Sequence, residues 1–117
     1  MLEQVNEWID KREEEGNLDR AIGRLEELIR ENPEKDILRG KMSNAYFYKG
    51  LFSQEGSRER EDYFDKGVNF AKEAITLNPR YAKAYNGRAW AQLKVGRKSE
   101  ALADANKSLE LAAEDAA

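Results

Sequence analysis

Apolar residues recur along this chain at the spacing of helices. In the last segment, Ala101, Leu102, Ala105, Leu109 and Ala112 recur at three- and four-residue steps, which places them in one stripe of a helix. Residue types that favour helices, mainly Ala, Leu, Glu, Lys and Arg, fill the segments around only two prolines. No segment shows the strict alternation of a strand. The pattern predicts an all-α fold with six helices.

An Asn-Pro pair punctuates the chain at two places, residues 32–33 and 78–79, which lie 46 positions apart. Each proline follows a small residue, Ala21 or Gly67, by 12 positions. Asparagine is a good N-cap, and proline is tolerated at the first position of a helix, so we expect new helices to begin at these pairs. The repetition predicts helical units that bury their apolar faces against one another.

Three glycines extend the repetition to a third copy. Gly16, Gly50 and Gly96 each close the first half of a copy, and we expect each of them at the bend between two helices. Gly16 precedes Ala21 by five positions, and Gly96 precedes Ala101 by five, whereas the corresponding separation in the middle copy is 17. The middle copy therefore carries 12 extra residues, and the period without them is 34.

This period resembles that of the tetratricopeptide repeat family. The likeness extends to small or apolar residues at the sites where the family packs its paired helices closely, namely Ala21/Gly67/Ala101, Leu25/Ala71/Ala105 and Leu28/Ala74/Ser108. The resemblance covers nearly the whole chain and implies one domain, residues 1–117, with units 2–35, 36–81 and 82–115. It implies a superhelical array of three antiparallel helix pairs, a non-enzymatic scaffold that binds a peptide or partner protein in its inner groove.

The resemblance assigns the inner groove to the first helix of each unit. The groove residues that follow from it are Asn44, Phe47, Tyr48, Lys83, Asn86 and Trp90. Asp10 and Glu13 make one end acidic while Lys83 and Lys94 make the other basic, which suits a peptide with one basic and one acidic end. Some family members hold acidic chaperone tails with inward lysines, asparagines and an arginine. Gly87 stands in place of that arginine, and the acidic end repels such a tail, so we exclude this partner.

The asparagines and the aromatic residues of the predicted groove have different expected roles. Asn44 and Asn86 occupy the same inner-surface site, one turn to either side, where an amide can bond a peptide backbone without reading its sequence. Phe47 and Trp90 either contact the partner or simply pack between units. The residues alone leave both roles open.

The 12-residue insertion lengthens the hairpin of the middle unit. We expect its first helix to continue through Glu55, a turn with an N-cap at residues 56–57, and a second helix that begins at Arg58. Each helix then gains about six residues, so the hairpin protrudes beyond its neighbours.

Folding back at this turn brings Leu51 and Phe52 near Tyr63 and Phe64. These side chains are either the small core of the protrusion or a secondary, partner-binding knob made of Leu51, Phe52 and Tyr63. Both interpretations stay open at this stage.

Composition excludes several classes of function. The chain has 117 residues with 23 acids and 20 bases, and its net charge of −3 does not suit non-specific nucleic-acid binding. Histidine and cysteine are absent, so the usual catalytic bases, nucleophiles and zinc ligands are missing. The acidic clusters lack the spacing of a calcium loop. We expect no enzyme activity, no metal and no cofactor.

The sequence leaves the compartment undetermined. No apolar run approaches the roughly 20 residues that cross a bilayer, and no leader-like segment precedes the first helix. We therefore expect a soluble chain without membrane insertion, with the cytoplasm favoured over secretion. An alternative is a resemblance to tetratricopeptide proteins associated with tripartite periplasmic (TRAP) transporters, carried by residues 46–50 and 77–79, which implies a truncated secreted chain.

The last helix offers self-assembly as a further alternative. Repeat arrays usually end in a helix with a polar outer face, whereas Leu109 and Leu111 precede a short acidic tail. If these leucines are exposed, they favour a homo-oligomer through the C-terminal helix. The alternatives are a monomer with a frayed last turn and an engineered repeat unit whose only function is assembly.

Overall fold

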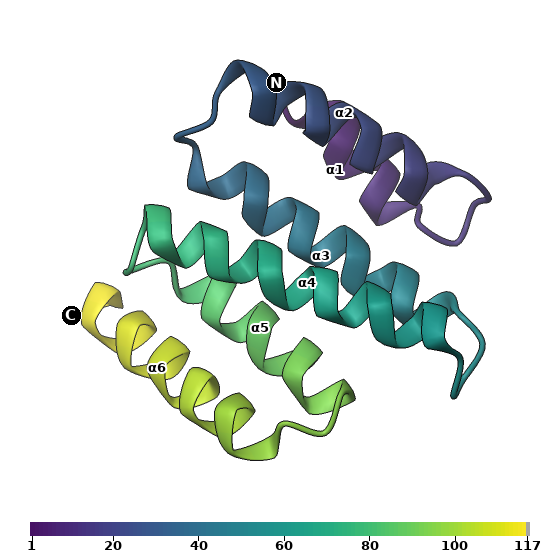
Figure 1. The fold of residues 1–117 in the computed structure, drawn as a ribbon. Coiled ribbons are helices and arrows are strands. Elements are labelled where there is room, and N and C mark those ends of the chain that lie inside the picture. Colours follow the sequence, from purple (N-terminus) through teal and green to yellow (C-terminus); the bar gives the residue numbers. More distant parts are fainter. Residues whose placement is uncertain (117) are drawn as a thin grey trace.

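The chain folds into paired helices. The computed structural model describes residues 1–116 and contains six helices within them (Figure 1). They are α1 (Glu3–Asp10), α2 (Asn17–Glu31), α3 (Asp36–Phe52), α4 (Arg58–Leu77), α5 (Ala82–Lys94) and α6 (Lys98–Ala116). Consecutive helices form antiparallel hairpins, which lie side by side as a tetratricopeptide-like array. No strand occurs in this part of the chain, so the all-α prediction is confirmed.

The glycines at the bends differ in one place from the prediction. Gly16 and Gly96 both have φ of +84° in the turns that follow α1 and α5, where only glycine is unstrained. Gly50 is instead a buried residue inside α3, and the bend of the middle hairpin uses Gly56, whose φ is +79°. The prediction for Gly50 is wrong because the insertion moves the turn to residues 53–57 and supplies another glycine there.

The Asn-Pro pairs end helices and do not begin them. Asn32 and Asn78 are the C-caps of α2 and α4, and the next helices start at Asp36 and Ala82 after a short turn. The Asn32 Nδ2 donates to the carbonyl oxygen of Leu28 at 3.0 Å. The predicted N-caps are therefore wrong. The Asn32 amide is used at the helix end that precedes Pro33. The Asn78 amide instead donates to the Asp36 carboxylate at 2.8 Å, and its oxygen accepts from the Arg80 backbone N–H at 3.1 Å.

The middle hairpin is elongated, though its two helices share the insertion unequally. The fourth helix has 20 residues and begins at Arg58 as predicted, with the Ser57 side chain accepting a hydrogen bond from the Arg60 backbone N–H at 3.1 Å. The third helix ends at Phe52 and not at Glu55. Its end is capped because the Arg60 guanidinium donates to the carbonyl oxygens of Gly50 and two nearby residues at 3.2–3.3 Å.

The core is continuous along the first three helices and is joined to α4 by close backbone packing. The buried apolar cluster consists of Val5, Ile9, Leu18, Ala21, Ile22, Leu25, Leu28, Leu38, Met42 and Ala45. Ser43 on α3 donates its hydroxyl to the Gly67 carbonyl oxygen on α4 at 2.7 Å. Two small buried residues further along α4, Ala71 and Ala74, keep the same close approach.

The last hairpin is held by polar contacts. Arg88 on α5 forms two hydrogen bonds with the Asp104 carboxylate on α6, at 2.7 and 2.8 Å, and Asp104 is 7% exposed. The Arg88 pKa is raised because its guanidinium donates to this carboxylate. Leu111 lies two turns further along the same face of α6 and is 1% exposed. The expected exposure of Leu111 is therefore wrong, whereas Leu109 is 70% exposed.

Candidate functional site

The six predicted groove residues converge in one hollow of about 620 Å³ between α3 and α5. Its lining is Asn44, Phe47, Tyr48, Leu51, Lys83, Asn86, Gly87, Trp90 and Lys94. We call this hollow the groove. Three lining residues, Leu51, Gly87 and Lys94, were not among the predicted six.

Helical spacing explains why these side chains share one surface. Along α3, the contributions stand at positions 44, 47, 48 and 51, and along α5 they stand at 83, 86, 87, 90 and 94. Steps of three, four and seven residues return to one side of a helix. The two helices lie close together at Gly87, where an added Cβ would lie 3.7 Å from the Asn44 Oδ1.

Exposure separates the floor of the groove from its walls. Phe47 is half-buried, and its ring packs 5.6 Å from Phe64 and 5.9 Å from Tyr48, so it contributes to the core as well as to the floor. Trp90 is 53% exposed and does not fill a gap between units. The side chains of Asn44 and Asn86 are also exposed. The groove therefore exposes a large apolar side chain and two side-chain amides.

The charge of the groove is simpler than the predicted gradient. Its charged lining residues are Lys83 and Lys94, and no carboxylate lines it among residues 1–116. The Arg12 guanidinium lies 4.1 Å from the centre of the Tyr48 ring, which adds a third cation beside the aromatic floor. The groove thus favours an anionic group next to an apolar one.

Of the predicted acidic end, Glu13 lines a different hollow, of about 660 Å³, near the tips of the first two hairpins, and Asp10 lines neither hollow. Its lining includes residues 13–15 and Asp19, which pairs with Lys49. Phe52 and Tyr63 also line it. This hollow is separate from the groove, so the acidic and basic residues do not form one continuous track.

The three predicted knob residues are therefore divided between two hollows. Leu51 faces the groove, whereas Phe52 and Tyr63 line the acidic hollow. Phe52 is 57% exposed, and Phe64 turns inward against Gly50, where an added Cβ would lie 2.6 Å from the Phe64 Cε1. The tip consequently has no common core of Leu51, Phe52 and Tyr63.

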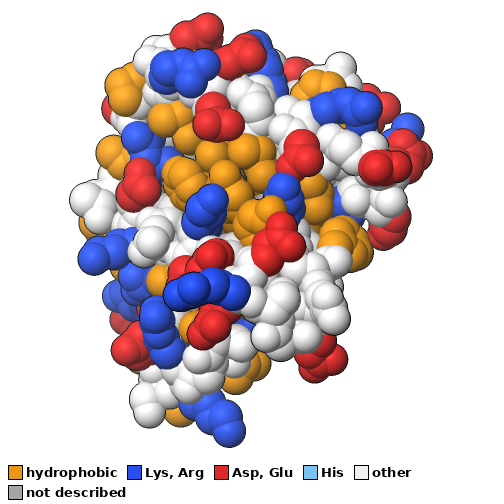
Figure 2. Space-filling model, turned by 45° about the vertical axis from the view of Figure 1, so that its right-hand side comes forward, with side chains coloured by type: hydrophobic (Ala, Val, Ile, Leu, Met, Phe, Trp, Pro, Cys, Tyr) orange, Lys and Arg blue, Asp and Glu red, His pale blue; other side chains and the backbone are white. Residues whose placement is uncertain are grey.

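Sequence reasoning missed an aromatic stack that joins α3 to α4. The Tyr46 ring lies 6.1 Å from Tyr63 and 5.7 Å from Phe70, and the Lys66 ammonium lies 5.2 Å from the Tyr46 ring. Burial raises the pKa of Tyr46. Figure 2 shows an apolar patch ringed by charged side chains on the face that it displays. The seven-residue step from Tyr63 to Phe70 was the available signal, because it places both rings on one face of a helix.

Other classes of site are not seen in the described chain. Across residues 1–116, no group of three or more Asp and Glu side chains is arranged to hold a metal ion. None of the helices in this range combines the length and apolar character that a membrane crossing requires.

The array of helical hairpins has a tetratricopeptide-like fold. Residues 70–103 match the family model of the tetratricopeptide repeat, so the resemblance is confirmed. The matched segment runs from the second half of α4 through α5 into the first turns of α6, and it contains Lys83, Asn86 and Trp90. Tetratricopeptide repeats generally mediate protein–protein interaction, and the fold is typically non-enzymatic.

A curated relative shows similarity over a longer stretch. Protein SGT1 homolog of Oryza sativa subsp. japonica is 41% identical over 51 residues, which are 44% of this chain and 14% of that protein. The chain thus matches only a small share of that relative's length.

Proposed function

We propose that this chain is a non-enzymatic interaction module whose groove holds a peptide segment of a partner protein. The observation that supports the proposal most strongly is the convergence of Trp90, Asn44 and Asn86, all exposed, on one hollow between two helices. An exposed tryptophan supplies a large apolar contact, and amides bond the peptide backbone whatever its sequence. The domain boundaries that we propose are those of a single array, residues 1–117, with units 2–35, 36–81 and 82–115.

The lining favours a particular kind of peptide. Lys83 and Lys94 stand on the same helix as Trp90, and carboxylates are absent from the lining among the described residues. A peptide with an apolar side chain beside one or two carboxylates matches this arrangement, since opposite charges steer the encounter and set the register. The basic end of the originally expected peptide finds no counterpart in the groove.

A charge-reversal pair tests this proposal. An array of peptides that combine apolar and acidic residues is screened against the chain, and the affinity of the best peptide is then measured by titration calorimetry. Lys83→Glu should weaken that affinity at least about tenfold, because an attraction becomes a repulsion. The control is Lys72→Glu, an identical charge change on the exposed surface of α4 outside the groove.

The outcomes separate the possibilities. If Lys83→Glu and Asn44→Ala, made as separate variants, both retain the affinity for the peptide, that result would contradict groove binding. An equal loss in Lys83→Glu and Lys72→Glu would indicate that only net charge matters. Stronger binding of basic peptides would reverse the proposed ligand class.

Self-assembly is a second candidate function, and the exposure of Leu102 and Leu109 on α6 favours it. An engineered unit made only for assembly has the same surface. The tripartite transporter alternative stays a prediction that depends on residues 46–50 and 77–79. The cytoplasmic location likewise stays a prediction.

A further inference from the structure

Exposed apolar side chains are concentrated on the last hairpin. The large hydrophobic residues that the structure leaves exposed are Met1, Ile37, Phe52, Leu77, Trp90, Leu93, Leu102 and Leu109. Four of these eight belong to α5 and α6. Trp90, Leu93 and Leu102 line a hollow of about 410 Å³ between the two helices, together with Ala89, Ala101 and Ala105. We call this the end surface.

The end surface belongs to the last hairpin that the structure describes, where α6 has one main neighbouring helix. The fifth helix packs against both helices of the preceding hairpin, but α6 packs chiefly against α5 and forms an outer edge in Figure 1. Its outward stripe consists of Leu102, Ala105, Leu109 and Ala112, with Lys98 one turn before. This spacing of three and four residues is that of a helix that packs against another helix.

We infer that two copies of this chain pair through the end surface about a two-fold axis, with their α6 helices antiparallel. This inference develops the second candidate function and does not depend on the groove. A head-to-tail contact would need a matching apolar surface on the first hairpin, where Met1 is the only large hydrophobic residue exposed within the described chain. Like-on-like pairing instead places apolar side chains of one copy on those of the other and closes the assembly at two.

The charges at the ends of α6 match the antiparallel arrangement. If Leu102 of each copy lies opposite Leu109 of the other, Lys98 falls beside the last turns of the opposite α6. Glu110 is available there, because its ion pair with the exposed Lys107 is long, at 3.8 Å. A lysine at the C-terminal end of a helix also interacts favourably with the helix dipole.

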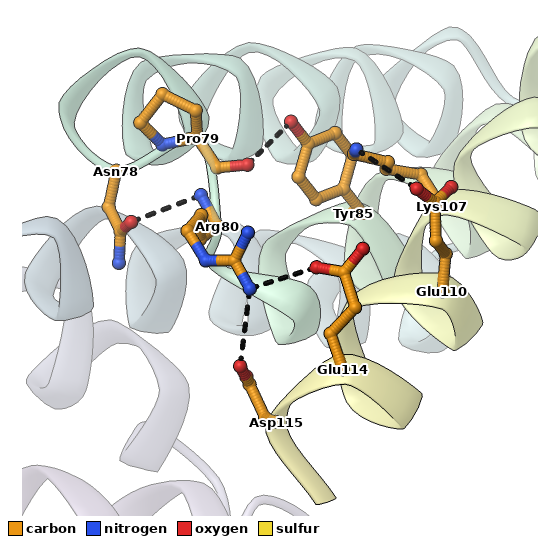
Figure 3. Close-up of polar contacts among 8 residues, drawn as sticks. All are labelled: Asn78, Pro79, Arg80, Tyr85, Lys107, Glu110, Glu114 and Asp115. Atoms are coloured by element: carbon orange, nitrogen blue, oxygen red, sulfur yellow. Dashed lines mark hydrogen bonds and ion pairs between the residues drawn. The ribbon is translucent and has the colours of Figure 1, made fainter. Parts of the chain in front are cut away.

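The end of α6 is held in place for this contact. Figure 3 shows Arg80, in the turn that follows α4, reaching two carboxylates near the C-terminus of α6. Its guanidinium lies 2.9 Å from Glu114 and 3.4 Å from Asp115. These two carboxylates raise the Arg80 pKa and are held by Arg80, whereas Glu110 has the longer 3.8 Å ion pair with Lys107 and is the proposed partner of Lys98.

The test is the mass in solution as a function of concentration. Sedimentation equilibrium of the full chain, from about 1 μM to 1 mM, should show a monomer that converts to a dimer and to nothing larger. The double variant Leu102→Glu/Leu109→Glu should weaken dimerisation by more than about a hundredfold, because four apolar contacts become four buried charges. The control is Leu77→Glu, which places one charge on a leucine of α4 that is 40% exposed.

A charge swap tests the antiparallel geometry. Lys98→Glu should weaken the dimer about tenfold, and adding Glu110→Lys should restore it, since each variant pair rebuilds the contact with reversed signs. Circular dichroism checks that every variant keeps its helices. Because Glu110→Lys also restores the net charge, the control is Lys98→Glu/Glu31→Lys, whose second change lies on the exposed surface of α2 and should leave the dimer weak.

Several results would overturn the inference. They are a monomer throughout the concentration range, masses beyond a dimer, equal weakening by Leu77→Glu, and no restoration in the charge swap. Trp90 and Asn86 line both the groove and the end surface, so substitutions there do not separate the two proposals. Lys83→Glu should impair the groove and leave the dimer intact, and Leu102→Glu/Leu109→Glu should do the reverse.

Discussion

The middle hairpin and the last hairpin solve the same packing problem in different ways. In α3 and α4, two glycines allow the helices and a large ring to approach closely, and Ser43 links the backbones with one hydrogen bond. In α5 and α6, the link is the ion pair between Arg88 and Asp104. The third helix is covered by α2 on one side and α5 on the other, whereas α6 has α5 as its main neighbour.

The difference teaches that the neighbours of a helix, more than its composition, decide which apolar residues are buried. The sixth helix carries leucines on two faces, and only the face with Leu111 meets a partner helix. Leu109, two positions earlier, remains in solvent. The middle hairpin has neighbours on both sides, and its exposed large hydrophobic residues, Ile37, Phe52 and Leu77, lie near the ends of its helices.

The largest expected effect tests how much the middle hairpin depends on its buried ring. Phe64 is 1% exposed, and Phe64→Ala should lower the free energy of unfolding by about 3–5 kcal/mol, because it leaves a cavity. Phe52→Ala, at a ring that is 57% exposed, should change it by less than about 0.5 kcal/mol. Chemical denaturation measures both. Similar losses in the two variants would contradict the assigned burial.

Substitution of Gly50 tests the same buried contact from the side of α3. Gly50→Ala should cost about 1–3 kcal/mol, because its Cβ overlaps the Phe64 ring, and the cost should vanish in a Phe64→Ala background. Gly23→Ala on α2 is the matched control, since no atom lies within 4 Å of its added Cβ. That control should stabilise the chain by about 0.5–1 kcal/mol. An additive double-mutant cycle would show that Gly50 does not contact the ring.

The ion pair of the last hairpin should be the next largest contribution. Asp104→Ala should lower the free energy of unfolding by about 1.5–3 kcal/mol, because Arg88 loses two charged hydrogen bonds while partly buried. Glu110→Ala, at an exposed carboxylate of the same helix, is the comparison and should have little effect on the monomer at low concentration. Equal free energies of unfolding in the two variants would contradict a stabilising role for the Arg88–Asp104 ion pair.

A smaller effect is expected for the hydroxyl that links α3 to α4. Ser43→Ala should cost about 1 kcal/mol, because the Gly67 carbonyl oxygen loses a buried hydrogen bond. Ser108→Ala removes the corresponding contact to the Ala82 carbonyl oxygen at 2.9 Å in the more open last hairpin. Thermal unfolding should show the greater loss for Ser43, and the opposite order would contradict the comparison.

The smallest effect is a pH dependence at the junction of the two hairpins. Burial, with a further contribution from Asp36, raises the pKa of Tyr81 above its ordinary 10.0. The unfolded chain then releases the Tyr81 proton at a lower pH than the folded chain does. The contribution of Tyr81 to the free energy of unfolding is therefore complete below pH 10 and is lost as pH rises through the folded-state pKa. Unfolding in urea between pH 9 and 12 should show a shallower decline for Tyr81→Phe. An unchanged decline would mean that other groups carry the effect.

The candidate groove was predictable because it depends on helical geometry. The resemblance assigned Asn44 and Asn86 to the inner face of the first helix in their units, and helical spacing then places them on one surface. The arrangement of the predicted knob residues was not predictable. Leu51 lines the groove, whereas Phe52 and Tyr63 line the acidic hollow. Which way a ring turns depends on the space that Gly50 leaves for Phe64.

The amino-acid sequence was enough to predict the number of helices and their order, because both follow from periodicity and from glycine at the bends, which are local properties of the chain. The sides from which the groove is built followed from the resemblance to the family. The tertiary structure alone decided that Gly50 packs against a ring, that the Asn-Pro pairs end helices and that Leu111 is buried beside an exposed Leu109. Those outcomes depend on which neighbouring helix occupies each face, and the apolar pattern of a single helix does not carry that information.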